Sequence, residues 1–177
     1  EDPGSSFVIG DVDVSHGRVS NLQSTTDPKV WKIDFTPEAG FEGTGSVTVA
    51  AGKFTDPSGN ANTASATVSS SIDTKAPTVT AVAISSNAGT DNTYKLGDEV
   101  TVSVTFSEAI TVTGTGVNRP YLNLNVGSLL RQAYYSTSSS DNRTLTFKYT
   151  IQSGDNTADG ISIAANALTA GGGSLKD

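Results

Sequence analysis

The sequence predicts an all-β protein built from antiparallel β-sandwich domains. Three observations support this prediction: apolar and polar residues alternate over short runs, turn-forming residues separate the runs, and no window carries a helical stripe. The 177 residues include 18 glycines, which suits a chain with many turns. Because no helix is long enough for a crossover, the strands are expected to follow antiparallel Greek-key wiring.

Alternation and turn punctuation place the individual strands in the second half of the chain. Segments such as "NAGTDN", "SSSDN" and "SGDNTADG" supply the turns between them. The expected strands span residues 78–85, 99–106, 121–126, 131–136, 143–151 and 161–165.

An internal repeat divides the chain. Residues 30–55 align without a gap with residues 144–169, at an offset of 114 positions (149 minus 35). Apolar positions fall on apolar positions at period 2, so both copies are expected to contain equivalent strands with the same inward faces. In this alignment Trp31 falls on Leu145, which predicts that the indole is a core anchor rather than a sugar-stacking platform.

The stretch "SSSIDTKAPTVTAV" is expected to join the two copies. We assign residues 1–73 to the C-terminal part of a first repeat that lacks its opening strands. Residues 74–177 form a second repeat that lacks its closing strand. Pro77 restricts the residue before it to extended conformations and favours a straight exit. The free edge of the first repeat is expected either to lower its order or to accept a strand from a neighbouring chain.

Composition narrows the function classes. Acids outnumber bases 18 to 11, and the net charge of −7 argues against nucleic acid and anionic membranes as partners while favouring divalent cations. The chain has no cysteine, which removes disulfides, thiol catalysis and zinc–thiolate sites. No apolar run approaches the roughly 20 residues needed to insert across a bilayer.

Several longer segments resemble a known family. "FTPEAGFEGTGSVTVAAGKFTDPSGNANTAS", "YKLGDEVTVSVTFSEAITVTG" and "GDNTADGISIAANAL" resemble the bacterial immunoglobulin-like repeats of large surface adhesins, including the repeats-in-toxin type used in biofilms. The resemblance implies two tandem immunoglobulin-like domains at the cell surface or in secreted form. It also implies calcium at or near the joints between repeats.

The acids near the joint are the first candidate calcium site. Immunoglobulin-like wiring brings the loop after the second strand and the segment before the last strand beside the start of the domain. This predicts that Glu108 and Asp177 of the second copy meet Asp73 in the joint, with Glu38 or Glu42 contributed by the first copy. Calcium takes six to eight oxygens, mostly from carboxylates and carbonyls. The alternative is that each acid is simply solvated.

Two other acidic groups are candidates with the same chemistry. Asp155 and Asp159 lie in the loop that matches "PEAGFEG", and Asp91 is expected at the same end of the second copy. There the alternative is a turn in which Asp and Asn make only local hydrogen bonds. Asp2 and Asp56 form a weaker candidate at the far end of the first copy.

Catalysis has little support in the sequence. His16 is the only histidine, and "SHGR" predicts that it is an exposed turn residue. No G-x-S-x-G motif lies near it, so a serine triad is not indicated. Paired carboxylates for glycoside hydrolysis stay open in principle, although the acids fall in inter-strand loops.

The sequence therefore predicts non-catalytic stalk repeats of a bacterial adhesin. Calcium and the neighbouring repeats of the same chain are the expected partners, and the expected location is extracellular. The competing interpretation is a binding module that recognises a glycan or protein through its end loops. Such a module would show exposed aromatic residues clustered at one end or face.

Overall fold

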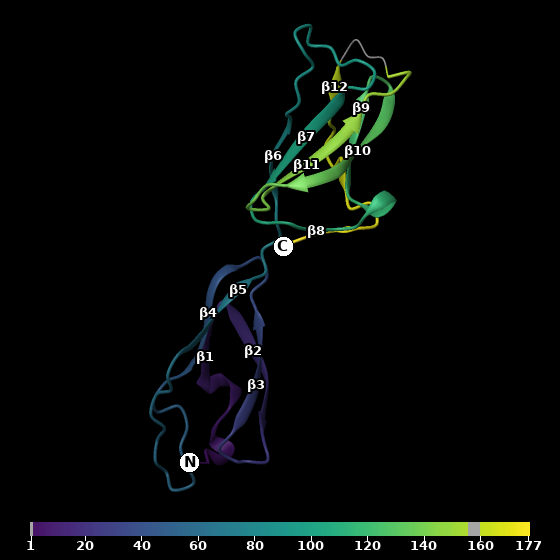
Figure 1. Cartoon of the computed structure of the whole chain (residues 1–177). Coiled ribbons are helices and arrows are strands. Elements are labelled where there is room, and N and C mark those ends of the chain that lie inside the picture. The colour runs from purple at the N-terminus through teal and green to yellow at the C-terminus, as the bar shows by residue number, and fades with distance from the viewer. Residues whose placement is uncertain (1, 156–159) are drawn as a thin grey trace. The chain divides into compact units, whose positions relative to one another are not determined.

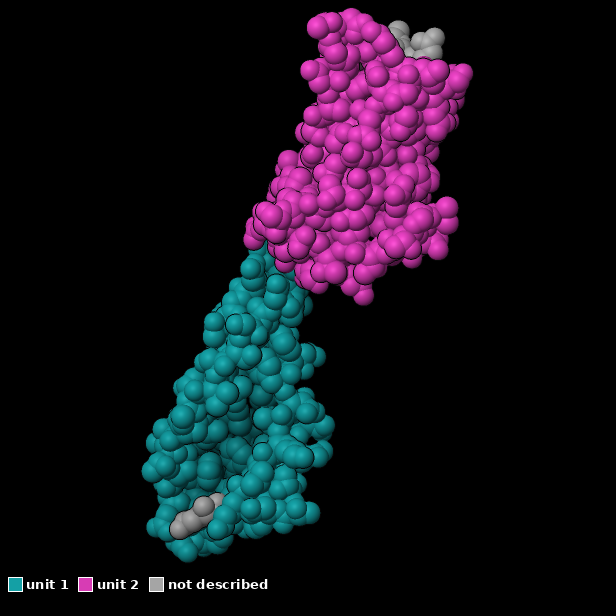
Figure 2. Space-filling model, viewed as in Figure 1, with its two compact units in different colours: residues 1–76 teal, residues 77–177 magenta. Residues whose placement is uncertain are grey.

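A computed structural model describes residues 2–155 and 160–177 of the protein. The chain divides into two compact units, Glu1–Ala76 and Pro77–Asp177, which Figure 2 shows in different colours. The repeat alignment predicts this division at Asp73, slightly earlier in the chain. Each unit is built from antiparallel strands, and the described residues contain no α-helix. The all-β fold and its immunoglobulin-like β-sandwich class are as the sequence predicts.

The first unit contains two small sheets (Figure 1). One has the order β1-β4-β5, and the other is the β2-β3 hairpin. Two short 3-10 turns, Gly4–Ser6 and Ile9–Asp11, precede the strands. The strands are β1 (Val12–Ser15), β2 (Gly17–Ser24), β3 (Trp31–Pro37), β4 (Glu42–Val49) and β5 (Val68–Asp73).

Half-buried aromatic side chains fill the first unit. Trp31, on β3, meets the ring of Phe7 edge-on with centroids 5.5 Å apart. Phe7 in turn lies 4.9 Å from the ring of Phe54. Ile72 is the only hydrophobic side chain of this unit that is buried, among the residues described. The first unit is therefore a thin sandwich with an incompletely covered interior.

The second unit has one large sheet and one small one. The large sheet has the order β12-β9-β10-β11-β7-β6, with β13 also paired to β9, and the small sheet pairs β14 with β8. A 3-10 turn, Gly116–Asn118, precedes β9. The strands are β6 (Val79–Ile84), β7 (Glu99–Phe106), β8 (Thr111–Thr113), β9 (Tyr121–Val126), β10 (Leu129–Ser138), β11 (Thr144–Thr150), β12 (Ile161–Ser162), β13 (Leu168–Thr169) and β14 (Ser174–Lys176).

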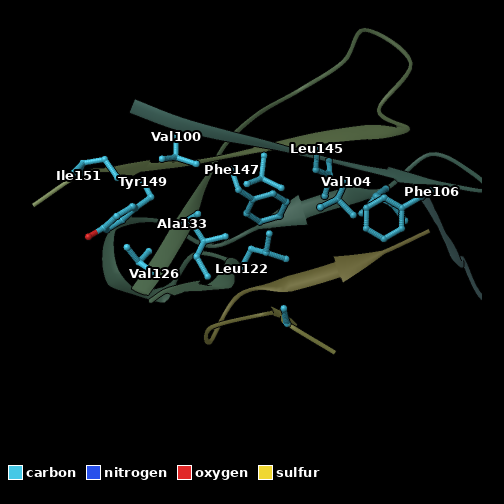
Figure 3. Close-up of a cluster of buried hydrophobic side chains, with 14 residues drawn as sticks. Val100, Val104, Phe106, Leu122, Val126, Ala133, Leu145, Phe147, Tyr149 and Ile151 are labelled. Carbon is cyan, nitrogen blue, oxygen red and sulfur yellow. The ribbon is translucent and has the colours of Figure 1, made fainter. Parts of the chain in front are cut away.

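Strand β10 connects the two layers of the large sheet, because it pairs with a strand of each layer. It pairs with β9 from Leu129 to Tyr134, and with β11 from Tyr134 to Ser138. Because β10 changes partner at Tyr134, the side chains of β9 face those of β7 and β11 across the core (Figure 3). Phe147 and Leu145 on β11 and Leu124 on β9 are 0% exposed, so this core is dry and closely packed.

The first strand of the repeat alignment is a strand in both units, with the same alternation of inward residues. Trp31 lies on β3 and Leu145 on β11. The depth differs, because Leu145 is fully buried whereas Trp31 is only half-buried against Phe7.

The second strand of the repeat departs from the prediction. β4 has eight residues, but its counterpart β12 has only two, where the sequence predicted a strand over 161–165. Within that predicted strand, residues 163 and 164 are outside any strand and residue 165 begins a turn. The sequence also missed the short strands β8, β13 and β14, whose two or three residues are too few for alternation to show.

Candidate metal centre

Two acids of the second unit lie together at the end where that unit begins. Glu108 follows β7 and is half-buried, and Asp177 follows β14 and is exposed. A carboxylate oxygen of each lies within 4.8 Å of the other, a separation that one cation can bridge.

Backbone pairing explains why these acids meet. The N–H of Ser107, the residue before Glu108, donates to the carbonyl of Thr78 at 2.9 Å. The N–H of Thr78 donates to the hydroxyl of Ser107 at 3.0 Å. On the other side, β14 pairs with β8 so that Lys176 lies opposite Thr111, just after Glu108. Both acids are thus fixed beside the first residues of the second unit.

A cation already lies at this end of the unit. The guanidinium of Arg143 donates to the carbonyl of Ser107 at 2.7 Å. This places a positive charge beside the residue that precedes Glu108. A divalent ion at this end would have to be held by several protein oxygens at once, and not by charge attraction alone.

The first unit ends in a second pair of acids. Glu42 and Asp73 are directly opposite each other in the register of β4 and β5. Like charges in such a cross-strand position destabilise the pair. The ammonium of Lys75 lies 3.5 Å from the Glu42 carboxylate, but both side chains are more than half exposed, so the contact contributes little. The backbone N–H of Lys75 donates to Asp73 at 3.2 Å.

The loop that carries Glu38 is held rigidly at the same end of the first unit. The Thr74 hydroxyl donates to the carbonyl of Glu38 at 2.5 Å and accepts the N–H of Phe41 at 3.1 Å. The ring of His16 stacks on Phe41, with centroids 3.9 Å apart and planes 9° apart, and its Nδ1 lies 3.4 Å from the Glu38 carboxylate. His16 is exposed in the turn between β1 and β2, as predicted.

Side chains and backbone groups of the protein itself bind the Asp155 carboxylate, so its burial is explained without a metal ion. Its side chain is only 1% exposed and pairs with the Arg131 Nε at 2.8 Å. It also accepts hydrogen bonds from the Tyr149 hydroxyl and from the Gln152 N–H. Burial opposes ionisation of Asp155, but the hydrogen bonds outweigh it and hold the pKa of the carboxyl below its ordinary value. Burial, followed by the bond to Asp155, raises the pKa of Tyr149 to about 12.

Of the remaining candidate acids that the structure describes, Asp2 and Asp56 line the same cavity and Asp91 lies apart from them. Asp91 pairs with Lys95 at 3.1 Å and caps its own turn by accepting the N–H of Thr93. Asp159 falls outside the described residues. Asp2 and Asp56 line one cavity of about 360 Å³ at the other end of the first unit. Each of these two also accepts local backbone hydrogen bonds, from Gly4 to Asp2 and from Ser58 and Asn60 to Asp56.

The comparison with protein families bears on the first unit. Residues 1–72 match the family model of the bacterial Ig-like domain. No curated protein and no solved structure matches the chain.

A bacterial Ig-like domain fits a repeat of a surface protein, and domains of this class are as a rule not catalytic. Within the described residues, no helix has the length and apolar character needed to cross a membrane.

Sequence reasoning missed the partners of Asp155. Arg131 precedes it by 24 residues, and alternation alone gives no sign that a charged residue of β10 turns toward the loop after β11. A weak signal existed. Asp155 follows a strand of alternating apolar and polar residues and is flanked by turn residues, which suits a carboxylate that closes a loop as well as one that binds an ion.

Proposed function

We propose that the chain is a pair of calcium-stiffened stalk repeats of a bacterial surface adhesin, which hold a distal binding domain away from the cell. The observation that carries this proposal is the placement of acids at the end of the first unit and at the beginning of the second. Glu108 and Asp177 lie together where the second unit begins, and Glu42 and Asp73 are cross-strand partners where the first unit ends.

The covalent link makes a shared ion feasible. Only residues 74–77 separate Asp73 from Thr78, which is hydrogen-bonded to Ser107. An extended chain covers at most about 3.5 Å per residue, so Asp73 stays within roughly 17 Å of Thr78 in any arrangement of the units. In the proposed bound state, Asp73 joins Glu108 and Asp177 around one calcium ion, and Glu42 or Glu38 contributes from the first unit.

Calcium binding would convert a flexible connection into one preferred arrangement. An ion that binds only this arrangement, present at about 100 times its dissociation constant, stabilises it by roughly 2.7 kcal/mol. That is a factor of about 100 in the population of the bound arrangement relative to any one other orientation, which shifts the connection toward it.

The competing function, recognition of a ligand through end loops, is less well supported. The aromatic rings of the first unit pack on one another, as in the contact of Phe7 with Trp31, or on His16, as Phe41 does. Among the described residues of the first unit, these rings therefore do not form a free aromatic platform at one end.

Calcium titration followed by thermal melting tests the proposal. Extracellular modules bind calcium with dissociation constants near about 0.1 to 1 mM, and titration of the wild type over this range is expected to give saturable binding and a higher melting temperature. Glu108→Gln and Asp177→Asn should each weaken binding by about tenfold or more, because a charged ligand oxygen is lost. Asp13→Asn, which removes an exposed acid of β1, is the matched control and should bind as the wild type does. Absence of saturable binding by the wild type would contradict the proposal.

A further inference from the structure

A cleft opens in the second unit where β10 separates from β11. The two strands stop pairing at Tyr134 and Lys148. Beyond this point β10 follows β9, while β11 follows β7. The resulting cleft has a volume of about 480 Å³, which is within the range of small-molecule sites. Its lining includes Gln132 on β10 and Thr150 on β11, both exposed next to buried core residues.

An ion pair to a buried carboxylate holds the cleft in shape. Arg131 of β10 and Tyr149 of β11 both bind the Asp155 carboxylate, and both contribute to the cleft wall. The two diverging strands are thereby fixed to one loop. The Asp155 side chain, which joins the two strands, is only 1% exposed. The cleft is therefore formed before any ligand binds.

Arg119 gives the cleft an uncompensated positive charge. Its guanidinium lies 4.8 Å from the centre of the Tyr134 ring, and its Nε is buried without a hydrogen-bond partner in the described part of the chain. Arg119 forms no ion pair with any described residue, whereas the other two cations of the lining do. Lys148 pairs with Glu99 at 2.8 Å, and Arg131 pairs with Asp155. Of the three cations that line the cleft, Arg119 is therefore the one without an ion-pair partner among the described residues.

The remaining lining is suited to hydroxyl groups. The Tyr134 hydroxyl donates to the side-chain oxygen of Gln132 at 2.6 Å, so the amide N–H groups of Gln132 are left for a ligand. Thr150 and Gln152 add further exposed donors and acceptors. Leu130, which is 64% exposed, contributes an apolar surface at the edge. A polar lining with one apolar surface is complementary to a sugar ring, which has polar hydroxyl groups and an apolar face.

We propose that this cleft binds an acidic saccharide, with the carboxylate of a uronic acid on Arg119 and the ring hydroxyls on Gln132, Thr150 and Gln152. A guanidinium pairs with a carboxylate through two parallel N–H···O bonds, and stacking on Tyr134 fixes its plane for this contact. One uncompensated charge matches a single carboxylate rather than a phosphate dianion. The largely polar lining favours a sugar over an apolar peptide. This function is independent of the calcium proposal, because the cleft lies wholly within the second unit.

The test is titration of the 177-residue chain with tetragalacturonate in chelator, followed by NMR amide shifts. Chelator removes any ion bridge between sugar carboxylates and protein acids. We expect saturable shifts confined to residues 119, 130–134 and 148–152. Arg119→Gln should weaken binding by about tenfold or more, the loss expected for a charged hydrogen bond. Arg119→Lys should retain only part of the affinity, because a lysine ammonium cannot make the two parallel hydrogen bonds of a guanidinium to one carboxylate. Arg18→Gln, which removes an exposed arginine of the first unit, is the matched control and should bind normally.

Two further probes separate the alternatives. Methyl-esterified tetragalacturonate, which lacks the charge, is expected not to bind, and N-acetyl-trialanine, which has a carboxylate but no sugar hydroxyls, is expected to bind much more weakly. If the ester binds as well as the acid, recognition of the carboxylate is wrong. If the peptide binds as tightly as the sugar, the saccharide assignment is wrong. Should Arg119→Gln unfold the second unit, Gln132→Ala, an exposed substitution, supplies the test. Unchanged affinity of that variant, or no binding by the wild type, would overturn the proposal.

Discussion

The two units share a strand pattern but not a core. β3 and β11 occupy the same place in the repeat, yet Phe147 on β11 is fully buried while Ile33, its counterpart on β3, is only half-buried. The second unit has a closed cluster of buried hydrophobic side chains. The first has one such buried residue, Ile72, among those described. The same alternation of apolar residues therefore yields a deep core only where enough strands surround it.

Local hydrogen bonds give the first unit part of its order. Asn62 is an example: its side-chain oxygen accepts the N–H groups of Lys53 and Phe54, and its amide donates to the carbonyl of Ala50 at 2.8 Å. One side chain thus holds the long loop between β4 and β5. Each such bond contributes about 1 kcal/mol net, whereas burial of one large apolar side chain contributes about 1.5 to 3 kcal/mol. The first unit is consequently expected to be the less stable of the two.

Truncation of equivalent side chains in the two units should show the largest difference in stability between them. Phe147→Ala removes a fully buried ring and should destabilise the second unit by about 3 to 5 kcal/mol. Ile33→Ala, at the equivalent place on β3, should cost the first unit only about 1 kcal/mol, because its side chain is half-buried. Urea unfolding, with separate probes for the two units, measures both. Equal losses would show that the first unit has a core as tight as the second.

Removing the charge of Asp155 should have the next largest effect. Asp155→Asn leaves Arg131 without its anion. Because Arg131 is 28% exposed, we expect a loss of about 2 kcal/mol rather than the larger penalty of a fully buried pair. Asp91→Asn breaks an exposed pair with Lys95 and should change stability by less than about 1 kcal/mol.

Acid should reproduce part of this loss. The pKa of Asp155 is lower in the folded state, so its stabilising contribution is complete above its ordinary pKa and disappears as the pH falls through the folded value. Thermal melting between pH 6 and strongly acidic solution, compared with Asp155→Asn, checks the sign. A second-unit transition that resists acid in the wild type would exclude an ionised Asp155 as a source of stability.

Alkaline solution should affect the second unit through Tyr149. Its pKa is raised to about 12 in the folded state, so the neutral phenol is favoured by folding. The stabilising effect is complete below the ordinary tyrosine pKa of about 10 and is lost as the pH rises toward 12. The melting temperature of the second unit is expected to fall by several degrees over this interval. Tyr149→Phe should remove that dependence, and an equal alkaline loss in this variant would assign it to other groups.

Substitution of Gly45 tests how closely the first unit is packed around Ile72. Gly45 is buried on β4, and a Cβ there would clash with the end of the Ile72 side chain and lie 3.3 Å from the Ser15 carbonyl oxygen. Gly45→Ala should therefore cost about 1 kcal/mol, since the end of Ile72 can move but the carbonyl cannot move far. Gly10→Ala meets nothing within 4 Å and serves as the control. Equal melting temperatures would mean that Ile72 is loosely held.

The sequence predicted the features that depend on near neighbours. The bounds of β7 and β9 are those predicted, and β6 and β11 differ by one residue at each end, because strict alternation and turn residues specify them. The meeting of Glu108 with Asp177, which are far apart in the sequence, could be predicted only from the immunoglobulin-like wiring of the strands. Alternation could not reveal that β10 changes partner at Tyr134 and opens a cleft beside Arg119, because this depends on three strands at once.

Small-angle scattering with calcium and with chelator tests whether calcium fixes the connection between the units. For the wild type, calcium is expected to narrow the spread of interdomain orientations, and chelator to widen it. Asp73→Ala should resemble the chelated wild type in both conditions, whereas Asp13→Asn should respond as the wild type does. If the wild type keeps the same maximum dimension and the same spread of orientations in chelator, the connection is rigid without the ion and the proposed mechanism is wrong.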